Sequence, residues 1–170
     1  MATPPKVLDD DDGSISDEFV AWIVCEATMP ILILIGTWLS AQYAFDIHHP
    51  FLSTFGSGDL LPIATLVLLG ASAEIVHFVV FTNVTASRRV LSKHMLAHLV
   101  AVVVLAFAYG GIKGKGLQLL DTPTLSADAT QKLIGFATLT ICLTVSAFIL
   151  AFYSKNRLLD LKVKAAREKS

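Results

Sequence analysis

Charged side chains are scarce in this chain. Only 16% of its 170 residues are Asp, Glu, Lys or Arg, whereas soluble domains carry about 25%. Hydrophobic residues make up 54% of the sequence, and the mean hydropathy is +0.67. The formal net charge is −1, so the chain lacks the basic surplus that a nucleic-acid partner requires. We expect the lipid bilayer to be its main partner instead.

Cysteine and catalytic motifs are also sparse. The two cysteines, Cys25 and Cys142, both lie in apolar runs, which is typical of buried small side chains and not of a disulfide framework. No Gly-x-Ser-x-Gly, zincin His-Glu-x-x-His or phosphate-loop Gly-x-x-x-x-Gly-Lys-Ser/Thr sequence is present. The sequence therefore gives no positive sign of an enzyme, and we favour a function without catalysis.

The hydrophobic residues are concentrated in four runs, each long enough to cross a hydrocarbon layer of about 30 Å as an α-helix. The runs cover about 19–45, 60–81, 95–112 and 133–153. Pro30 lies inside the first run, where it frees the carbonyl of Glu26 and predicts a kink. The pair Gly110–Gly111 predicts the end of the third helix. The expected fold is all-α: a polytopic bundle of four transmembrane helices with short loops, within residues 16–153.

The two ends of the chain differ in charge. Residues 1–15 contain four consecutive aspartates and two prolines, a composition typical of a disordered acidic arm. Residues 154–170 are basic, and their leucines recur at helical spacing, which predicts a helical cytoplasmic tail. Ser126 is suited to cap an earlier start of the fourth helix.

Lysine and arginine predict the orientation, because cytoplasmic loops of membrane proteins carry an excess of both. With both termini in the cytoplasm, ten of the thirteen Lys and Arg residues lie on that side. The other three are Lys113, Lys115 and Lys132. We therefore expect cytoplasmic N- and C-termini. The bacterial inner membrane is the default location, since no organelle address is recognisable.

Ionisable side chains occur inside three of the four runs and at similar expected depth. They are Glu26, Glu74, His77 and His98. Counted at 1.5 Å per residue, each lies about 6–10 Å inside the cytoplasmic face. Placing such groups in lipid costs much free energy, so they usually face a protein interior or a water-filled cavity. The sequence therefore predicts one polar layer made by three helices, with His94 outside it as an ordinary interface residue.

The leading hypothesis for this layer is a pathway for protons or small ions, because Glu and His chains carry protons in pumps and transporters. Glu74 would be the central titrating group, with Glu26, His77 and His98 as its partners. Four spans rarely enclose a pathway alone, so we expect a homo-oligomer or a subunit of a larger membrane complex.

Two alternatives stay open. Glu74, His77 and His98 could hold a transition metal or a b-type haem in a redox subunit, because Glu-x-x-His is a ligand spacing of carboxylate di-iron bundles. The absence of any cofactor is the default expectation. Alternatively, the layer only fixes helix packing, and the protein is a non-catalytic scaffold whose basic tail docks a cytosolic protein or anionic lipid.

Overall fold

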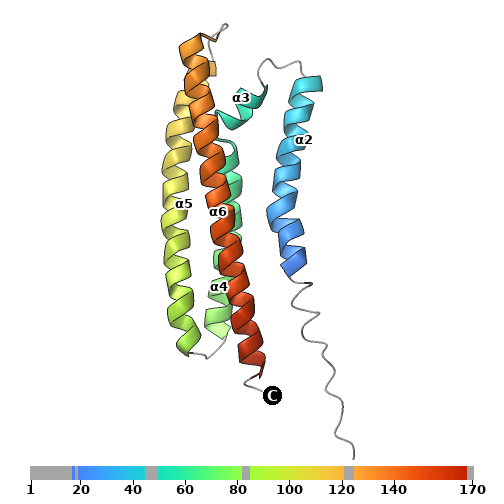
Figure 1. The fold of residues 1–170 in the computed structure, drawn as a ribbon, viewed down its shortest axis with the longest axis vertical. Coiled ribbons are helices and arrows are strands. Elements are labelled where there is room, and N and C mark those ends of the chain that lie inside the picture. The colour runs from blue at the N-terminus through green and yellow to red at the C-terminus, as the bar shows by residue number, and fades with distance from the viewer. Residues whose placement is uncertain (1–16, 18, 45–49, 82–84, 121–124, 168–170) are drawn as a thin grey trace, which may run out of the picture.

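The computed structural model describes residues 17, 19–44, 50–81, 85–120 and 125–167. All regular secondary structure in these ranges is helical, which confirms the all-α prediction for them (Figure 1). The elements are the π-helix η1 (Ile23–Thr28) and the α-helices α2 (Met29–Ala44), α3 (Pro50–Phe55), α4 (Leu60–Phe81), α5 (Thr85–Leu120) and α6 (Ala127–Arg167). The acidic arm expected at residues 1–15 lies outside the described residues.

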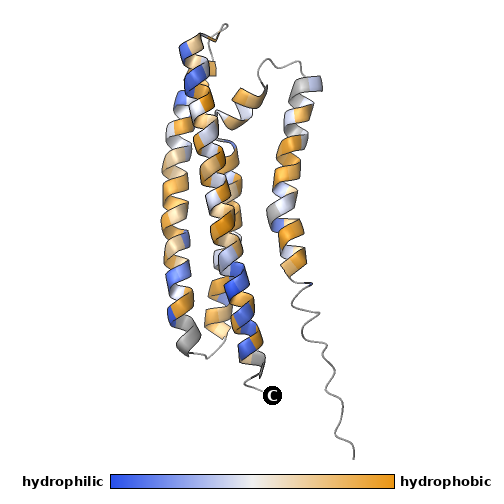
Figure 2. Ribbon diagram, viewed as in Figure 1, coloured by the Kyte–Doolittle hydropathy of each residue, from blue (hydrophilic) through white to orange (hydrophobic). Residues whose placement is uncertain are grey.

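Four stretches of the described chain are long and apolar enough to cross a membrane, which is compatible with an integral membrane protein. They are Phe19–Ser40, Leu60–Phe81, Arg89–Leu120 and Ala127–Ala165. Apolar residues occupy the middle of the long helices, and polar residues gather towards the ends of α5 and α6 (Figure 2). Many large apolar side chains, such as Leu66 and Phe107, are exposed. An apolar outer surface of this kind is typical of helices that meet lipid.

Helices α4, α5 and α6 pack side by side, and α2 stands beside them, joined through the short α3 (Figure 1). The main core lies among these three helices. Its buried residues include Leu61, Ala64, Leu68 and Ala71 of α4, Leu105 and Ile112 of α5, and Ala147 and Ala151 of α6. Trp22 reaches the same core from the start of the first span. The alanines of α4 and α6 are small enough to let helix backbones approach closely.

The first span is irregular immediately before Pro30. Residues Ile23–Thr28 form a π-helical segment, and the N–H of Met29 donates to the carbonyl of Val24, five residues earlier. Proline supplies no N–H, and π-helical turns interrupt the α-helical hydrogen-bond ladder in a similar way. The sequence predicts a kink at Pro30, and the structure has a π-helical segment directly before this proline, which includes Glu26.

Helix α5 is longer than the third apolar run predicts. Helix α5 continues to Leu120, so the predicted end at Gly110–Gly111 is wrong. A glycine inside a helix costs only about 1 kcal/mol relative to alanine, which packing overrides. Helix α6 runs unbroken to Arg167. The N–H of Ala129 donates to Ser126 Oγ at 3.1 Å, which confirms the predicted cap.

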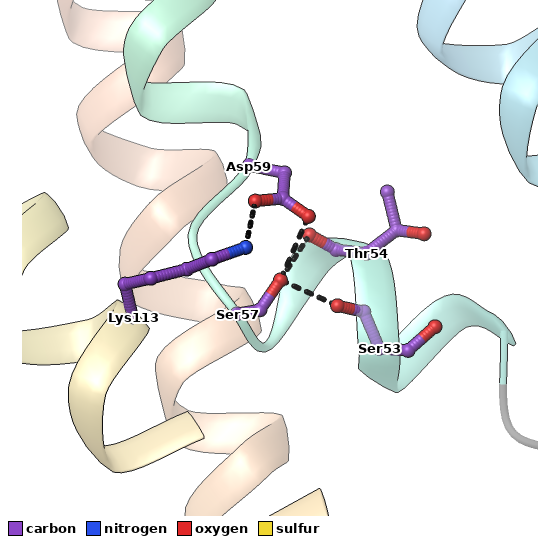
Figure 3. A network of polar contacts seen from close by, with 5 residues as sticks. All are labelled: Ser53, Thr54, Ser57, Asp59 and Lys113. Atoms are coloured by element: carbon purple, nitrogen blue, oxygen red, sulfur yellow. Dashed lines mark hydrogen bonds and ion pairs between the residues drawn. The ribbon is translucent and has the colours of Figure 1, made fainter. Parts of the chain in front are cut away.

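A polar network fixes the turn between α3 and α4 to α5 (Figure 3). Lys113 Nζ of α5 lies 2.6 Å from Asp59 Oδ1. The hydroxyl of Ser57 donates to Asp59 Oδ2 at 2.9 Å and also contacts the backbone carbonyls of Ser53 and Thr54. Gly58 in this turn has φ 82°, a conformation that glycine adopts without a side-chain clash.

Gly116 lets α5 approach this turn. A Cβ atom at position 116 would lie 2.7 Å from the carbonyl oxygen of Gly56. We expect Gly116→Ala to lower the free energy of unfolding by about 1–3 kcal/mol, the usual cost of overpacking. Reversible unfolding in detergent measures this change in the free energy of unfolding. At Gly114 of the same helix an added Cβ meets nothing within 4 Å. Gly114→Ala is therefore the matched control, and equal losses in both variants would contradict the close contact.

Candidate functional site

Four polar side chains form a continuous hydrogen-bonded chain across α4, α5 and α6. His98 of α5 is 1% exposed. Its Nδ1 lies 2.9 Å from Ser72 Oγ of α4, and its Nε2 lies 2.9 Å from Ser154 Oγ of α6. Ser154 Oγ also lies 2.9 Å from Nδ1 of His94, one turn before His98 on α5. We call the series His94, Ser154, His98 and Ser72 the His–Ser chain.

The donors of the His–Ser chain can all point the same way. Ser72 Oγ donates to the carbonyl of Leu68 at 2.7 Å, so it accepts from Nδ1–H of His98. A neutral imidazole carries one N–H, and Nε2 of His98 therefore accepts from the hydroxyl of Ser154. Ser154 in turn accepts from Nδ1–H of His94. These tautomers are assigned from the network, and they give every donor in the chain an acceptor.

This arrangement suits proton transfer. Imidazole and hydroxyl groups each accept one proton while releasing another, and separations of about 2.6–3.2 Å allow the transfer. One end of the chain is the half-buried His94. Ser72 and His98 at the other end line a largely apolar groove of about 340 Å³ between α4 and α5, which also includes the exposed side chains of Leu96 and Leu99. The His–Ser chain therefore links His94 to a groove on the surface of the bundle.

A buried ion pair lies next to the His–Ser chain. Lys155 follows Ser154 on α6, and its side chain is 2% exposed. It pairs with the carboxylate of Glu74 on α4, whose side chain is 28% exposed. Its Nζ also lies 5.9 Å from the centroid of the Trp22 ring, within the range of a cation–π contact. An ammonium removed from water requires such partners, so the pair ties the first span, α4 and α6 together.

The predicted polar layer is only partly assembled. His98 belongs to the His–Ser chain and Glu74 to the ion pair. Consecutive residues of α6, Ser154 and Lys155, join the two. This junction comes from a helix that contributes no residue to the predicted layer.

The other two predicted residues lie elsewhere. Glu26 is exposed, and its Oε2 leans over α4 at Gly70, where an added Cβ would lie 2.7 Å from it. His77 is exposed too, and its ring packs against Phe81 with centroids 4.6 Å apart. The structure therefore places neither side chain in the His–Ser chain or the ion pair.

The residues proposed as metal or haem ligands do not converge. Within the described ranges, no three His, Cys, Asp or Glu side chains are grouped to hold a metal ion. Both ring nitrogens of His98 are engaged by hydroxyls. Ligation of one group by His77 and His98 would require those bonds to break and the exposed His77 ring to move inward. The residues present do not fit a metal or a b-type haem at this place.

Ser154 and Lys155 make contacts that sequence reasoning did not anticipate. With the fourth span ending near residue 153, both fall in the basic tail. His94 is half-buried and bonded to Ser154, so its description as an ordinary interface residue is incomplete. A usable signal exists: Ser154 continues the helical spacing of Ala147 and Ala151, which marks one small-residue face of α6.

Comparison with known proteins yields no relative. No family model, curated protein or solved structure matches the chain. Its function is therefore argued from the His–Ser chain and the Glu74–Lys155 ion pair.

Proposed function

We propose that this chain is an integral membrane protein that moves protons through the cytoplasmic half of the bilayer along the His–Ser chain. The unbroken series of 2.9 Å contacts from His94 through Ser154 and His98 to Ser72 carries this proposal. Fixing two helices together needs a single hydrogen bond. Alternating imidazole and hydroxyl groups add a route along which a proton can pass, and imidazole changes charge near neutral pH.

The Glu74–Lys155 ion pair has a supporting role in our proposal. Lys155 follows Ser154 on α6 and pairs with Glu74 of α4, so the pair holds these two helices together beside the His–Ser chain.

Orientation and assembly form part of the proposal. Both termini lie in the cytoplasm, in accordance with ten of the thirteen Lys and Arg residues. His94 then lies near the cytoplasmic surface and Ser72 deeper in the membrane. Because one copy has few spans to enclose a pathway, it works as a homo-oligomer or with other membrane subunits, in a bacterial inner membrane.

Ser154→Ala tests the proposal, because this hydroxyl is the link between the two imidazoles. We expect proton flux into liposomes to fall about tenfold or more, since one strong hydrogen bond in the transition state is worth at least about 1.4 kcal/mol. A pH-sensitive dye trapped in liposomes under an imposed pH gradient reports the flux. Ser154→Thr retains a hydroxyl and is expected to restore most of it.

Thr138→Ala is the matched control. Thr138 lies on the same helix, is exposed and donates to the carbonyl of Ile134 at 2.9 Å. It should leave the flux unchanged. Identical flux in the two alanine variants would rule out the His–Ser chain as the route. An unaltered protein without any proton flux would instead favour the scaffold role of the basic tail.

A further inference from the structure

Two buried hydroxyls on α6 lie outside the His–Ser chain. Thr140 is 0% exposed and Thr144 is 6% exposed. Neither Oγ1 atom has a hydrogen-bond partner among the described residues. On the same helix, the exposed Thr138 donates to the carbonyl four residues earlier at 2.9 Å. A buried hydroxyl without a partner bears the full cost of its lost hydration, so such groups usually indicate a bound water or ion.

The two threonines share one face of α6 with Ser154. Positions 140, 144, 147, 151 and 154 recur at spacings of three or four residues, and all five side chains are buried. Between Thr144 and Ser154 this face carries only Ala147 and Ala151. At 1.5 Å per residue, the axial separation of Thr144 and Ser154 is about 15 Å. Hydroxyls thus stand at both ends of a stretch with small side chains.

There is room for water beside this stretch. A cleft of about 130 Å³ lies between α5 and α6. Its lining includes Ala101 and Leu105 of α5 and Leu143, Ser146 and Ala147 of α6. One water requires about 10–15 Å³ of such space, so several waters fit. The cleft adjoins Ala147, between Thr144 and Ser154 on the buried face.

We infer that Thr140 and Thr144 bind internal water and form the outer half of the proton route. This inference rests on the proposed function and extends it beyond the His–Ser chain. The threonine hydroxyls hold the first waters, and hydrogen-bonded waters beside the alanine stretch continue to the His98 end of the His–Ser chain, one turn before Ala101 of the cleft. Each transfer breaks one O–H or N–H bond and forms another on the next oxygen or nitrogen, so nothing is oxidised or reduced. The route then runs from Thr140 through His98 and Ser154 to His94.

The double variant Thr140→Val/Thr144→Val tests the inference, because valine keeps the shape of threonine without the hydroxyl. We expect proton flux into liposomes to fall at least about tenfold, as for the loss of one strong hydrogen bond in the transition state. The control is Thr138→Val, on the same helix but exposed. Its flux should equal that of the unaltered protein.

A second measurement does not depend on flux or on the variants folding. In the unaltered protein with isotope-labelled threonine methyl groups, magnetisation transfer from water should reach the methyls of Thr140 and Thr144. If no magnetisation transfer from water reached either methyl group, the inference would be overturned.

The flux data separate two failures. Normal flux in the double variant, with reduced flux in Ser154→Ala, would overturn the water route and leave the proposed function standing. Normal flux in both would overturn the route and the proposed function together.

Discussion

Replacing His98 by glutamine is expected to lower proton flux about a hundredfold or more, since a well-placed acid–base group contributes factors of about 10²–10⁴. His98 is the central link of the His–Ser chain, and both of its ring nitrogens are engaged by hydroxyls. Glutamine still offers a donor and an acceptor to Ser72 or Ser154. Its amide neither takes up nor releases a proton near neutral pH, so the chain would stay bonded but stop conducting.

His77→Gln is the matched control for this variant. The same substitution is made on α4, at an exposed ring that packs against Phe81. Liposome flux and the elution profile in detergent should both be unchanged. If His77→Gln lost as much flux as His98→Gln, the route would run through the predicted layer, and the His–Ser chain would be the wrong pathway. Normal flux in a folded His98→Gln protein would refute proton passage through this ring.

The second large effect is on stability. We expect Lys155→Met to lower the free energy of unfolding by about 3–5 kcal/mol, the usual loss when one member of a buried ion pair is removed. Methionine keeps the length of the apolar stem but removes the ammonium, which is 2% exposed and paired with Glu74. The Glu74 carboxylate would then remain in the bundle without its partner. Reversible unfolding in mixed micelles measures the loss.

Two further variants make this stability test specific. Lys132 pairs with Asp128 one turn away, but the two side chains are 57% and 73% exposed. Lys132→Met should therefore cost about 0.5 kcal/mol or less. The double variant Glu74→Leu/Lys155→Met should regain most of the loss, because an apolar pair can replace a buried ion pair at little cost. If the losses of Lys155→Met and Lys132→Met were alike, the ion pair would not be buried in solution.

The sequence alone determined the helices. Apolar runs and their length depend only on the order of residues, and the run predicted at 60–81 has the same bounds as α4. Features that depend on neighbouring residues can also be read from the sequence. The Ser126 cap and the irregular segment before Pro30 both involve groups within about one helical turn of each other. The helix end predicted at Gly110–Gly111 was wrong because packing along α5 outweighs the low helix propensity of glycine, which costs about 1 kcal/mol.

The tertiary structure decided which polar groups meet. Depth in the bilayer follows from counting residues, but it fixes position along a helix axis and not the neighbour that each side chain faces. His77 was predicted to join the polar layer, yet its ring is exposed, while Glu74 one turn earlier reaches Lys155. Ser154 became the link of the His–Ser chain because α6 continues past residue 153 against α4 and α5.

Lys155 illustrates the physical reason most clearly. A lysine is too costly to bury on its own, so sequence reasoning placed it in the aqueous tail. Its partner Glu74, on α4, precedes it by 81 residues in the chain, and Trp22 comes from the first span. Only the fold supplies these partners. The sequence by itself therefore determined an apolar helical chain with polar groups in its interior, whereas packing decided which of those groups form the His–Ser chain and the ion pair.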